Sequence, residues 1–123
     1  MKAHHLCLAA LLAGIASSAH ASSGDAPLLD GCVELGAQQE IIRNGGSQAV
    51  LLRDGQAHYR VVLRGSCSSL SFTRSLSFMA EGEKGKLCPS GSRVRTDRDD
   101  CAVNRVELLE ADEFAELKRR ARR

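Results

Sequence analysis

Apolar and polar residues alternate in short runs along the middle of the chain, and turn residues separate these runs. In the run 56–64, one face carries four apolar side chains: Ala57, Tyr59, Val61 and Leu63. A period of two residues predicts a half-buried β-strand. Another apolar run, 49–53, ends at the pair Asp54-Gly55 just before it. The two runs are therefore predicted to form a hairpin with a type I′ turn.

Further strands are predicted towards the C-terminus. The run 71–80 alternates, with three large apolar side chains on one face: Phe72, Leu76 and Phe78. Val94 lies between two arginines in a short strand candidate, and 101–109 is the last such segment. Glycine-containing turns separate these segments, as in proteins built from many short strands.

Near the C-terminus the period changes from two to that of a helix. Residues 110–121 contain an apolar stripe: Ala111, Phe114, Ala115 and Leu117. Acidic residues stand at the start of this segment and basic residues at its end, which favours a helix through its dipole. The chain as a whole is predicted to be mostly β: a small disulfide-stapled barrel or sandwich of roughly six or seven short strands with a C-terminal helix.

The first 21 residues have the order of a secretory signal peptide. Lys2 gives a positive start, residues 6–16 form an apolar run, and Ala19-His20-Ala21 is a small-x-small cleavage site. The apolar run is too short for a membrane anchor, and Cys7 stands at its start, where a lipid-attachment cysteine does not belong. We expect the mature chain to begin at Ser22 and to be periplasmic or secreted.

This cleavage sets the expected organisation of the chain. We assign residues 1–21 to the signal peptide, 22–30 to a disordered N-terminal segment, 31–110 to the β domain, and 111–123 to the C-terminal helix and basic tail. Loss of Lys2 leaves 16 Lys and Arg against 15 Asp and Glu, a net charge of +1. The mature domain is therefore nearly neutral.

Positive charge is concentrated at the C-terminus, in Lys118, Arg119, Arg120, Arg122 and Arg123. Without these five residues, 22–117 holds 11 basic and 15 acidic residues, a net charge of −4. No basic domain face therefore indicates specific nucleic-acid binding. The tail is expected either to make weak contact with an anionic surface or simply to end the helix, favoured by the helix dipole.

Four cysteines remain after cleavage: Cys32, Cys67, Cys88 and Cys101. An even number in an exported protein, without the C-x-x-C pair that often begins a zinc site, predicts two disulfides rather than a metal. We favour the nested pairing of Cys67 with Cys88 and Cys32 with Cys101, because the outer bridge would close a long loop. The sequential pairing of Cys32 with Cys67 and Cys88 with Cys101 is the main rival.

Short motifs around the cysteines resemble those of one protein family. They are Gly31-Cys32, His58-Tyr59-Arg60-Val61-Val62-Leu63, Gly65-Ser66-Cys67-Ser68-Ser69-Leu70, Lys86-Leu87-Cys88, Cys101-Ala102-Val103 and Val106-Glu107. Over residues 31–110 the chain is similar to small exported four-cysteine Gram-negative proteins that form a domain-of-unknown-function family. It differs at Val33, where many relatives have an aromatic residue, and it lacks the lipoprotein signal that some relatives have. The resemblance implies an envelope protein without an assigned activity and supplies no catalytic residues.

Candidates for chemistry are few. His58 is the one histidine outside the predicted signal peptide, and we interpret it as an exposed polar residue on a strand face. A serine cluster without a G-x-S-x-G context is interpreted as turn residues around a bridge: Ser66, Ser68 and Ser69. An acidic loop lacks the glycine and glutamate of a calcium loop: Asp97, Asp99 and Asp100. We assign no catalytic, cofactor-binding or metal-ligating residue.

The small size, the crosslinks and the missing catalytic constellation favour one class of function. We predict an exported, non-enzymatic, disulfide-stabilised envelope protein that acts as a binding or inhibitor-like module. Its expected partner is an envelope protein or a surface polymer. The alternative is a small secreted hydrolase in which His58 acts with a carboxylate as the base.

Overall fold

The fold is described by a computed structural model, which covers residue 14 and the ranges 26–43 and 46–122. In these ranges the chain forms a series of short strands followed by a helix. They are β1 (Val33–Glu34), β2 (Gln39–Arg43), β3 (Ala49–Asp54), β4 (Ala57–Leu63), β5 (Leu76–Ala80), β6 (Glu83–Lys84), β7 (Lys86–Leu87), β8 (Arg93–Thr96), β9 (Asp100–Leu109) and α1 (Ala111–Ala121). Apart from Gly14, the predicted signal peptide of residues 1–21 lies outside the described residues.

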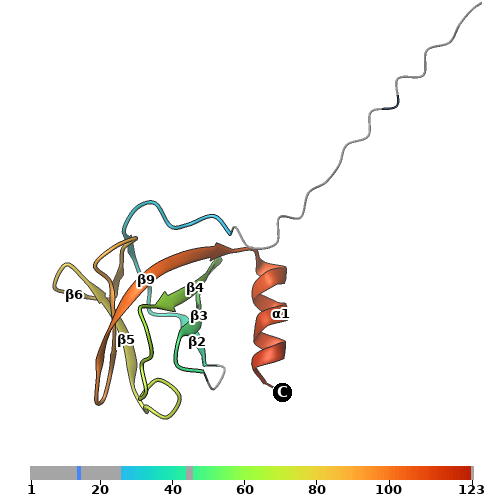
Figure 1. Ribbon diagram of the computed structural model, residues 1–123. Coiled ribbons are helices and arrows are strands. Elements are labelled where there is room, and N and C mark those ends of the chain that lie inside the picture. Colours follow the sequence, from blue (N-terminus) through green and yellow to red (C-terminus); the bar gives the residue numbers. More distant parts are fainter. Residues whose placement is uncertain (1–13, 15–25, 44–45, 123) are drawn as a thin grey trace, which may run out of the picture.

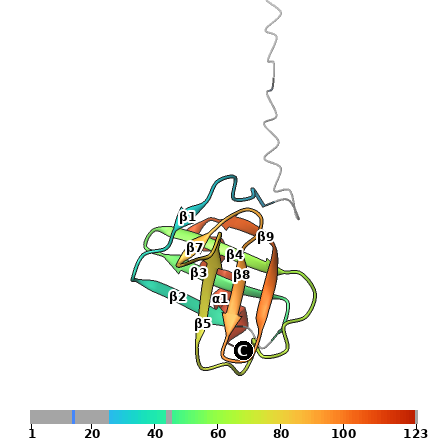
Figure 2. The same cartoon turned by 90° about the vertical axis from the view of Figure 1, so that its left-hand side faces the viewer.

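The strands form one large and one small antiparallel sheet. The large sheet has the order β2-β3-β4-β9-β8-β5-β6, and β1 pairs with β7 in the small one. The large sheet curls into a half-barrel: β2, β3 and β4 form one half, β8, β5 and β6 form the other, and the long β9 joins the two (Figure 1, Figure 2). The predicted mostly β class with a C-terminal helix is confirmed. Of the two predicted architectures, the half-barrel is closer to a barrel than to a sandwich.

The concave face of the half-barrel holds the main core. Strand β4 places three residues there, all at most 6% exposed: Tyr59, Val61 and Leu63. This is the face predicted from the alternation. Strand β9 contributes both Val103 and Val106, although their odd spacing would normally put them on opposite faces. The register against β4 skips Asn104, and this bulge turns both valines inward.

Helix α1 packs on the convex face, against β2 and β4 (Figure 1). Leu51 points to this face, because the residues on either side of it lie in the main core, and it is only 8% exposed. From the helix, Phe114 is buried and Leu117 half-buried, whereas Ala111 and Ala115 are exposed. The apolar stripe of the helix is therefore narrower than predicted, and it forms a second, smaller apolar layer outside the half-barrel.

The start of the helix is stabilised by its own residues. The Glu113 carboxylate accepts a hydrogen bond from the Glu110 backbone N–H at 3.1 Å, as in a capping box. Acidic residues lie in the first turn and basic residues in the last, as predicted. Within the described ranges, no helix has the length and apolar character needed to cross a bilayer.

The predicted hairpin between β3 and β4 is present, but its turn is shifted by one residue. Asp54 pairs with Ala57, so the two central residues are Gly55 and Gln56. A type I′ turn needs positive φ at both central positions. Gly55 has a φ of 59°, but Glu81 is the one non-glycine residue with positive φ in the described ranges. The type I′ assignment at this hairpin is therefore wrong.

The run 71–80 becomes a strand only in its second half. Strand β5 begins at Leu76, and the residues before it form a turn in which the Thr73 N–H donates to Ser69 O at 2.9 Å. The Thr73 side chain is held by Asp97 at 2.7 Å. Phe72 is consequently 57% exposed, with the Arg98 guanidinium 5.4 Å from its ring centre. The prediction that Phe72 shares the buried face of Phe78 is wrong.

The disulfides join Cys32 to Cys88 and Cys67 to Cys101, so neither predicted pairing is formed. The register of β1 against β7 places Val33 opposite Leu87. The preceding residue therefore lies opposite Cys88, and the two Cα atoms are 4.0 Å apart. After β4, the Arg64 N–H donates to Ala102 O at 2.9 Å, which brings Cys67 alongside the start of β9. Tertiary strand pairing, and not loop length, decides the connectivity.

The residues just before β1 are paired with β9. The Leu29 N–H donates to Val106 O at 2.9 Å, the Leu108 N–H donates to Pro27 O at 2.7 Å, and Leu29 is 7% exposed in the main core. We expected residues 22–30 to be disordered, but residues 27–29 of this range extend the sheet over the second half of β9. Residues 22–25 lie outside the described residues.

Candidate functional site

The half-barrel is open where its two outer flanks meet. Strand β2 pairs only with β3, and β5 pairs with β8 on one side but with β6 only through Met79 and Ala80 on the other. We call the opening between β2 and residues 75–78 the seam. A cleft of about 390 Å³ lies in it, lined on the β2 side by Gln39 and on the β5 side by residues 75–78.

Strand β5 presents unpaired peptide groups to the seam. The Gly85 N–H donates to Phe78 O at 2.8 Å, so the Phe78 carbonyl points towards this edge. Because peptide groups alternate in direction along a strand, Leu76 also turns its N–H and C=O to this edge. The β5–β6 pairing does not reach Leu76. A free strand edge is therefore exposed along the seam.

Strand β2 presents a second free edge. The Leu63 N–H donates to Gln48 O at 2.7 Å, so the even-numbered residues of β3 turn their peptide groups to β4 and the odd-numbered ones to β2. The backbone N–H and C=O groups of Arg53 therefore pair with those of Glu40 on β2. The next residue, Ile41, must turn its N–H and C=O away from β3 and into the seam. The two sides of the cleft thus both offer backbone donors and acceptors.

Each end of the seam is closed by different contacts. At the first end, the Leu35 N–H donates to Gly85 O at 2.7 Å, and the paired strands β1 and β7 with the Cys32–Cys88 bridge cross from one flank to the other. We call this the strap end. At the second, Arg43 Nη1 donates to Leu70 O at 3.3 Å and to Thr73 O. We call this the Arg43 end.

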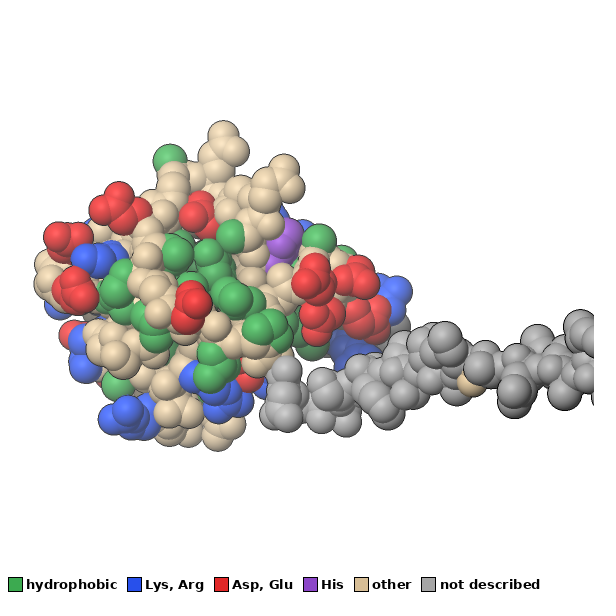
Figure 3. Space-filling model, turned by 90° about the horizontal axis from the view of Figure 1, so that it is seen from above, with side chains coloured by type: hydrophobic (Ala, Val, Ile, Leu, Met, Phe, Trp, Pro, Cys, Tyr) green, Lys and Arg blue, Asp and Glu red, His purple; other side chains and the backbone are tan. Residues whose placement is uncertain are grey.

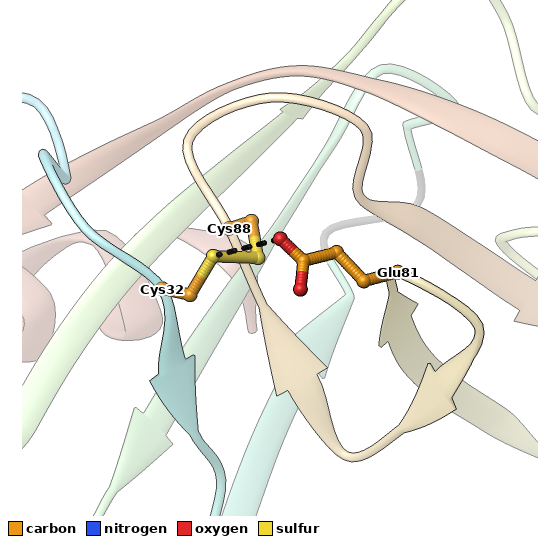
Figure 4. A group of neighbouring side chains, drawn as sticks. All are labelled: Cys32, Glu81 and Cys88. Atoms are coloured by element: carbon orange, nitrogen blue, oxygen red, sulfur yellow. Dashed lines mark hydrogen bonds between the residues drawn. A yellow bond between two sulfur atoms is a disulfide. The ribbon is translucent and has the colours of Figure 1, made fainter.

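At the strap end, Glu81 lies against the disulfide (Figure 4). Its Oε1 is 3.8 Å from Cys32 Sγ, a contact that is not a hydrogen bond because a disulfide sulfur has no proton. Glu81 and Gly82 both have positive φ, 52° and 75°, which is the type I′ geometry of a tight hairpin turn. That turn aims the Glu81 carboxylate back over the bridge, where its Oε2 accepts a hydrogen bond from Lys86 at 2.7 Å.

Among the residues that the structure describes, two groups have potential ligand atoms close enough for a metal ion: Cys32, Glu81 and Cys88, and Cys67, Asp99 and Cys101. In both groups the two cysteines are bonded to each other. Metals bind thiolates, which a disulfide does not offer. Each group is therefore a disulfide with a carboxylate beside it, and its sulfur atoms are not available as thiolate ligands.

The charge around the seam is positive. Lys84 and Arg95 line the cleft, and no acidic side chain does. Lys84 forms no ion pair with any residue that the structure describes. Arg95 lies 3.9 Å from Asp100, which binds Arg93 more closely at 2.6 Å. Leu76 and Phe78 also line the cleft. Leu76 is half-buried and packs at the border of the core, as does Ile41 of β2. The cleft combines an apolar floor with a cationic rim.

His58 lies on the convex face beneath helix α1. Its ring centre is 5.0 Å from that of Phe114, with the planes inclined at 55°. The side chain forms no hydrogen bond or ion pair with another residue in the described ranges. The prediction of a strand-face position is confirmed, but His58 is half-buried against the helix and not exposed.

The basic tail is largely occupied by ion pairs. Lys118 Nζ binds Glu40 Oε2 at 2.6 Å, and Arg119 and Arg120 both bind Glu116. Arg123 lies outside the described residues. Acidic side chains gather at the other end of the helix, on the face seen from above (Figure 3). The arrangement matches the interpretation of a helix end favoured by its dipole, and Arg122 alone of the described tail residues has a side chain without an ion pair.

The serine and acidic clusters are part of the loops between strands. Ser69 is buried, and its Oγ lies 2.7 Å from Thr96 Oγ1. Thr96 Oγ1 in turn accepts a hydrogen bond from the Asp99 N–H at 2.8 Å. These contacts tie the loop after β4 to the loop before β9. Ser66 and Ser68 are exposed residues of the first loop.

In the described ranges, four ionisable groups have a clearly shifted pKa. A hydrogen bond from Lys118 lowers the pKa of Glu40, and one from Arg119 lowers that of Glu116. A hydrogen bond to Glu81 raises the pKa of Lys86. Burial in the core, and secondarily the charge of Asp54, raises the pKa of the Tyr59 hydroxyl. These shifts keep the ion pairs charged and Tyr59 neutral at pH 7, so none provides an acid–base group near neutrality.

The residues of the seam were not found from the sequence. In the sequence, Arg43, Lys84 and Arg95 stand in ordinary strand and turn segments, and Ile41 and Leu76 stand in apolar strand runs. Only the strand order brings β2 and β5 to the two flanks of one opening. No local signal in the sequence marks that order.

In comparisons with known proteins, no family model, no curated protein and no solved structure matches the chain. The resemblance to four-cysteine exported proteins therefore stays a prediction.

Proposed function

We propose that the protein is an exported, non-enzymatic binding module, inhibitor-like in kind, which holds an envelope protein or a surface polymer in the seam. The observation on which this depends is the cleft of about 390 Å³ between two free strand edges. Binding sites are typically concave, with an apolar surface and a few polar groups that orient the ligand. The seam has this combination in Leu76, Lys84 and Arg95.

The crosslinks support a site that is formed before the ligand arrives. The Cys32–Cys88 bridge closes the strap end, and the Cys67–Cys101 bridge ties the loop after β4 to β9. A preorganised site loses less conformational entropy on binding, which increases affinity. Two disulfides also agree with an oxidising compartment such as the periplasm or the medium.

A non-enzymatic role is supported by the position of His58. A general base needs a hydrogen-bonded partner or substrate within about 3 Å and access to a cleft. His58 packs against Phe114 on the convex face, whereas the seam opens between β2 and β5. The alternative of a secreted hydrolase has no comparable support.

A capture experiment tests the proposal. Tagged mature protein is incubated with cell-envelope extract, in parallel with the double variant Lys84→Glu/Arg95→Glu and with Arg122→Glu, a charge reversal at the end of helix α1 and outside the residues that line the cleft. We expect one component to be retained by wild type and by Arg122→Glu and lost from the double variant. Equal retention by all three, or turnover of a substrate that depends on His58, would contradict the proposal.

A further inference from the structure

We infer that the ligand of the seam is an extended polypeptide segment with acidic outward-facing side chains, which binds as an added strand between β5 and β2. This inference depends on the proposed function and names the ligand class of that same site. Its support comes from a vacant strand position, from a second free edge opposite it, and from the side chains on the two faces of that position.

The vacant strand position lies beside β5. Strand β6 follows the β5 edge only over Glu83 and Lys84, and the last hydrogen bond joins the Gly85 N–H to Phe78 O. At Gly85, where φ is 81°, the chain turns away to form β7 and pair with β1. The free peptide of Leu76 lies next along that edge. A segment bound beside Leu76 would pair with the same edge of β5 that β6 pairs with at Met79 and Ala80.

The opposite flank can pair with the same segment. Each of the five steps from β2 through β3, β4, β9 and β8 to β5 is antiparallel, so β2 and β5 run in opposite directions across the seam. An inserted segment would be antiparallel to one flank and parallel to the other, and both geometries form ladders. Strand addition of this kind uses main-chain hydrogen bonds for affinity. The five residues of β2 limit the paired segment to about five residues.

The two faces of the position differ in chemistry. Phe78 is in the core, so Ser77 and Met79 on either side of it face outward. Arg95 is paired with Ser77 and Lys84 with Met79, which puts both cations on the outer face. The inner face of the position borders the half-buried Ile41 and Leu76. Alternate residues of the bound segment should therefore be apolar and acidic.

An anionic polysaccharide would satisfy the cations of the seam but not its peptide groups or its apolar side chains. Its carboxylates could bind the cations, but it has no row of amide groups spaced to match a strand edge and no apolar side chains for the floor. The free peptide groups of Ile41 and Leu76 favour a polypeptide.

The test uses synthetic peptides and the folded, oxidised protein. The probe is a capped six-residue peptide of alternating valine and glutamate, compared with a valine–lysine peptide and with a valine–glutamate peptide N-methylated at alternate residues. Amide NMR spectra of isotope-labelled protein are recorded during titration. We expect the valine–glutamate peptide to shift the amide signals of Ile41 and Leu76, and we expect the two control peptides to leave them unchanged, because they lack the charge or the backbone donors.

Variants of the protein examine the charges separately. Lys84→Glu and Arg95→Glu should each weaken binding of the valine–glutamate peptide by about fivefold, the size expected for a rim charge. Arg122→Glu should leave the affinity unchanged. Both seam residues are exposed, so the variants should fold, and the amide spectrum of each free variant verifies this.

The results that overturn the inference are distinct from those that overturn the proposed function. Polygalacturonate is titrated as a polyanion without amides. If it binds in a Lys84-dependent way while no peptide shifts Ile41 or Leu76, the seam is a binding site for a polymer and the added-strand inference is wrong. Equal binding of the methylated and unmethylated peptides would also overturn it. If neither probe binds while the captured envelope component still does so through the seam, only the ligand class is refuted.

Discussion

The two ends of the seam are closed by different kinds of contact. At the strap end, a disulfide, a two-pair strand ladder and the Leu35–Gly85 hydrogen bond join the flanks. At the Arg43 end, a single guanidinium bridges to the carbonyls of Leu70 and Thr73. The first closure is covalent, and the second consists of hydrogen bonds from an exposed side chain. The Arg43 end can therefore open without disturbing any strand pair, whereas the strap end cannot.

This difference shows how a small domain can combine a firm scaffold with an adaptable cleft. A bridge between distant residues restricts the unfolded chain and fixes the native contact. Hydrogen bonds from an exposed arginine exchange with water at little net cost. Substitutions at the strap end should therefore destabilise the domain more than substitutions at the Arg43 end. Substitutions beneath helix α1 should have little effect on binding at the seam.

The largest effect is expected at the strap end. Replacing Cys32 and Cys88 with serine should lower the free energy of unfolding by about 4 kcal/mol, because the bridge spans 56 residues of sequence. Denaturant unfolding measures the loss. Hydrogen exchange at the Leu35 N–H should become faster, because its bond to Gly85 O is no longer held by the bridge.

The second bridge is the matched control. Replacing Cys67 and Cys101 with serine should destabilise the domain by a similar amount, about 4 kcal/mol for a separation of 34 residues. It should not accelerate exchange at Leu35 selectively. If both double variants loosen the strap equally under native conditions, the strap is not an independent closure.

A smaller effect is expected at the other end. Arg43→Ala removes both hydrogen bonds to the loop before β5 and should cost about 1 kcal/mol, since the side chain is largely exposed. Unfolding measurements give the cost, and the amide spectrum should change at 70–73. Arg64→Ala, which removes an exposed arginine without a side-chain partner in the described ranges, is the control and should change stability by less than about 0.5 kcal/mol. An equal loss in both variants would show that Arg43 does not close the seam.

His58→Ala tests the convex face. It removes the contact with Phe114 and should lower stability by about 1 kcal/mol, while ligand binding at the seam stays unchanged. His58→Phe keeps an aromatic ring and should restore most of the stability. Binding is measured with the component captured from the envelope. Loss of a catalytic activity in a folded His58→Ala protein would refute the non-enzymatic proposal, and loss of binding would contradict the placement of the ligand in the seam.

The smallest effect concerns pH and the Glu40–Lys118 pair, which holds the end of α1 to β2. The pKa of Glu40 is lowered by Lys118, so the folded state favours the charged carboxylate. Its contribution is present above the ordinary pKa of about 4.5 and is lost as pH falls through the lower folded value. Lys118→Ala should be less stable than wild type by about 0.5 kcal/mol at pH 7, and the gap should close near pH 3. A gap independent of pH would mean that Lys118 acts through packing.

Several elements were predictable because their signals are local. The alternation of 57–63 alone showed which side chains of β4 are buried. The acidic residues from Glu110 onwards marked the start of α1 through the helix dipole. The four cysteines outside the predicted signal peptide predicted two bridges, which the structure has. In each case the physical cause lies within one element or in the composition of the chain.

What the sequence did not reveal depends on which distant segments meet. Phe72 alternates correctly with Phe78 but is turned outward by the Thr73–Asp97 contact. Cys32 finds Cys88 only because β1 pairs with β7, a contact of two residue pairs that periodicity cannot indicate.

The candidate site belongs to the same category. By itself the sequence determined which residues are apolar, where the hairpin strands β3 and β4 and the helix form, and that the domain is crosslinked. Only the tertiary structure decided that β2 and β5 are the flanks of one opening, since the order of strands in a sheet follows from non-local pairing. The seam is the place where that pairing stops, so no single segment contains a signal for it.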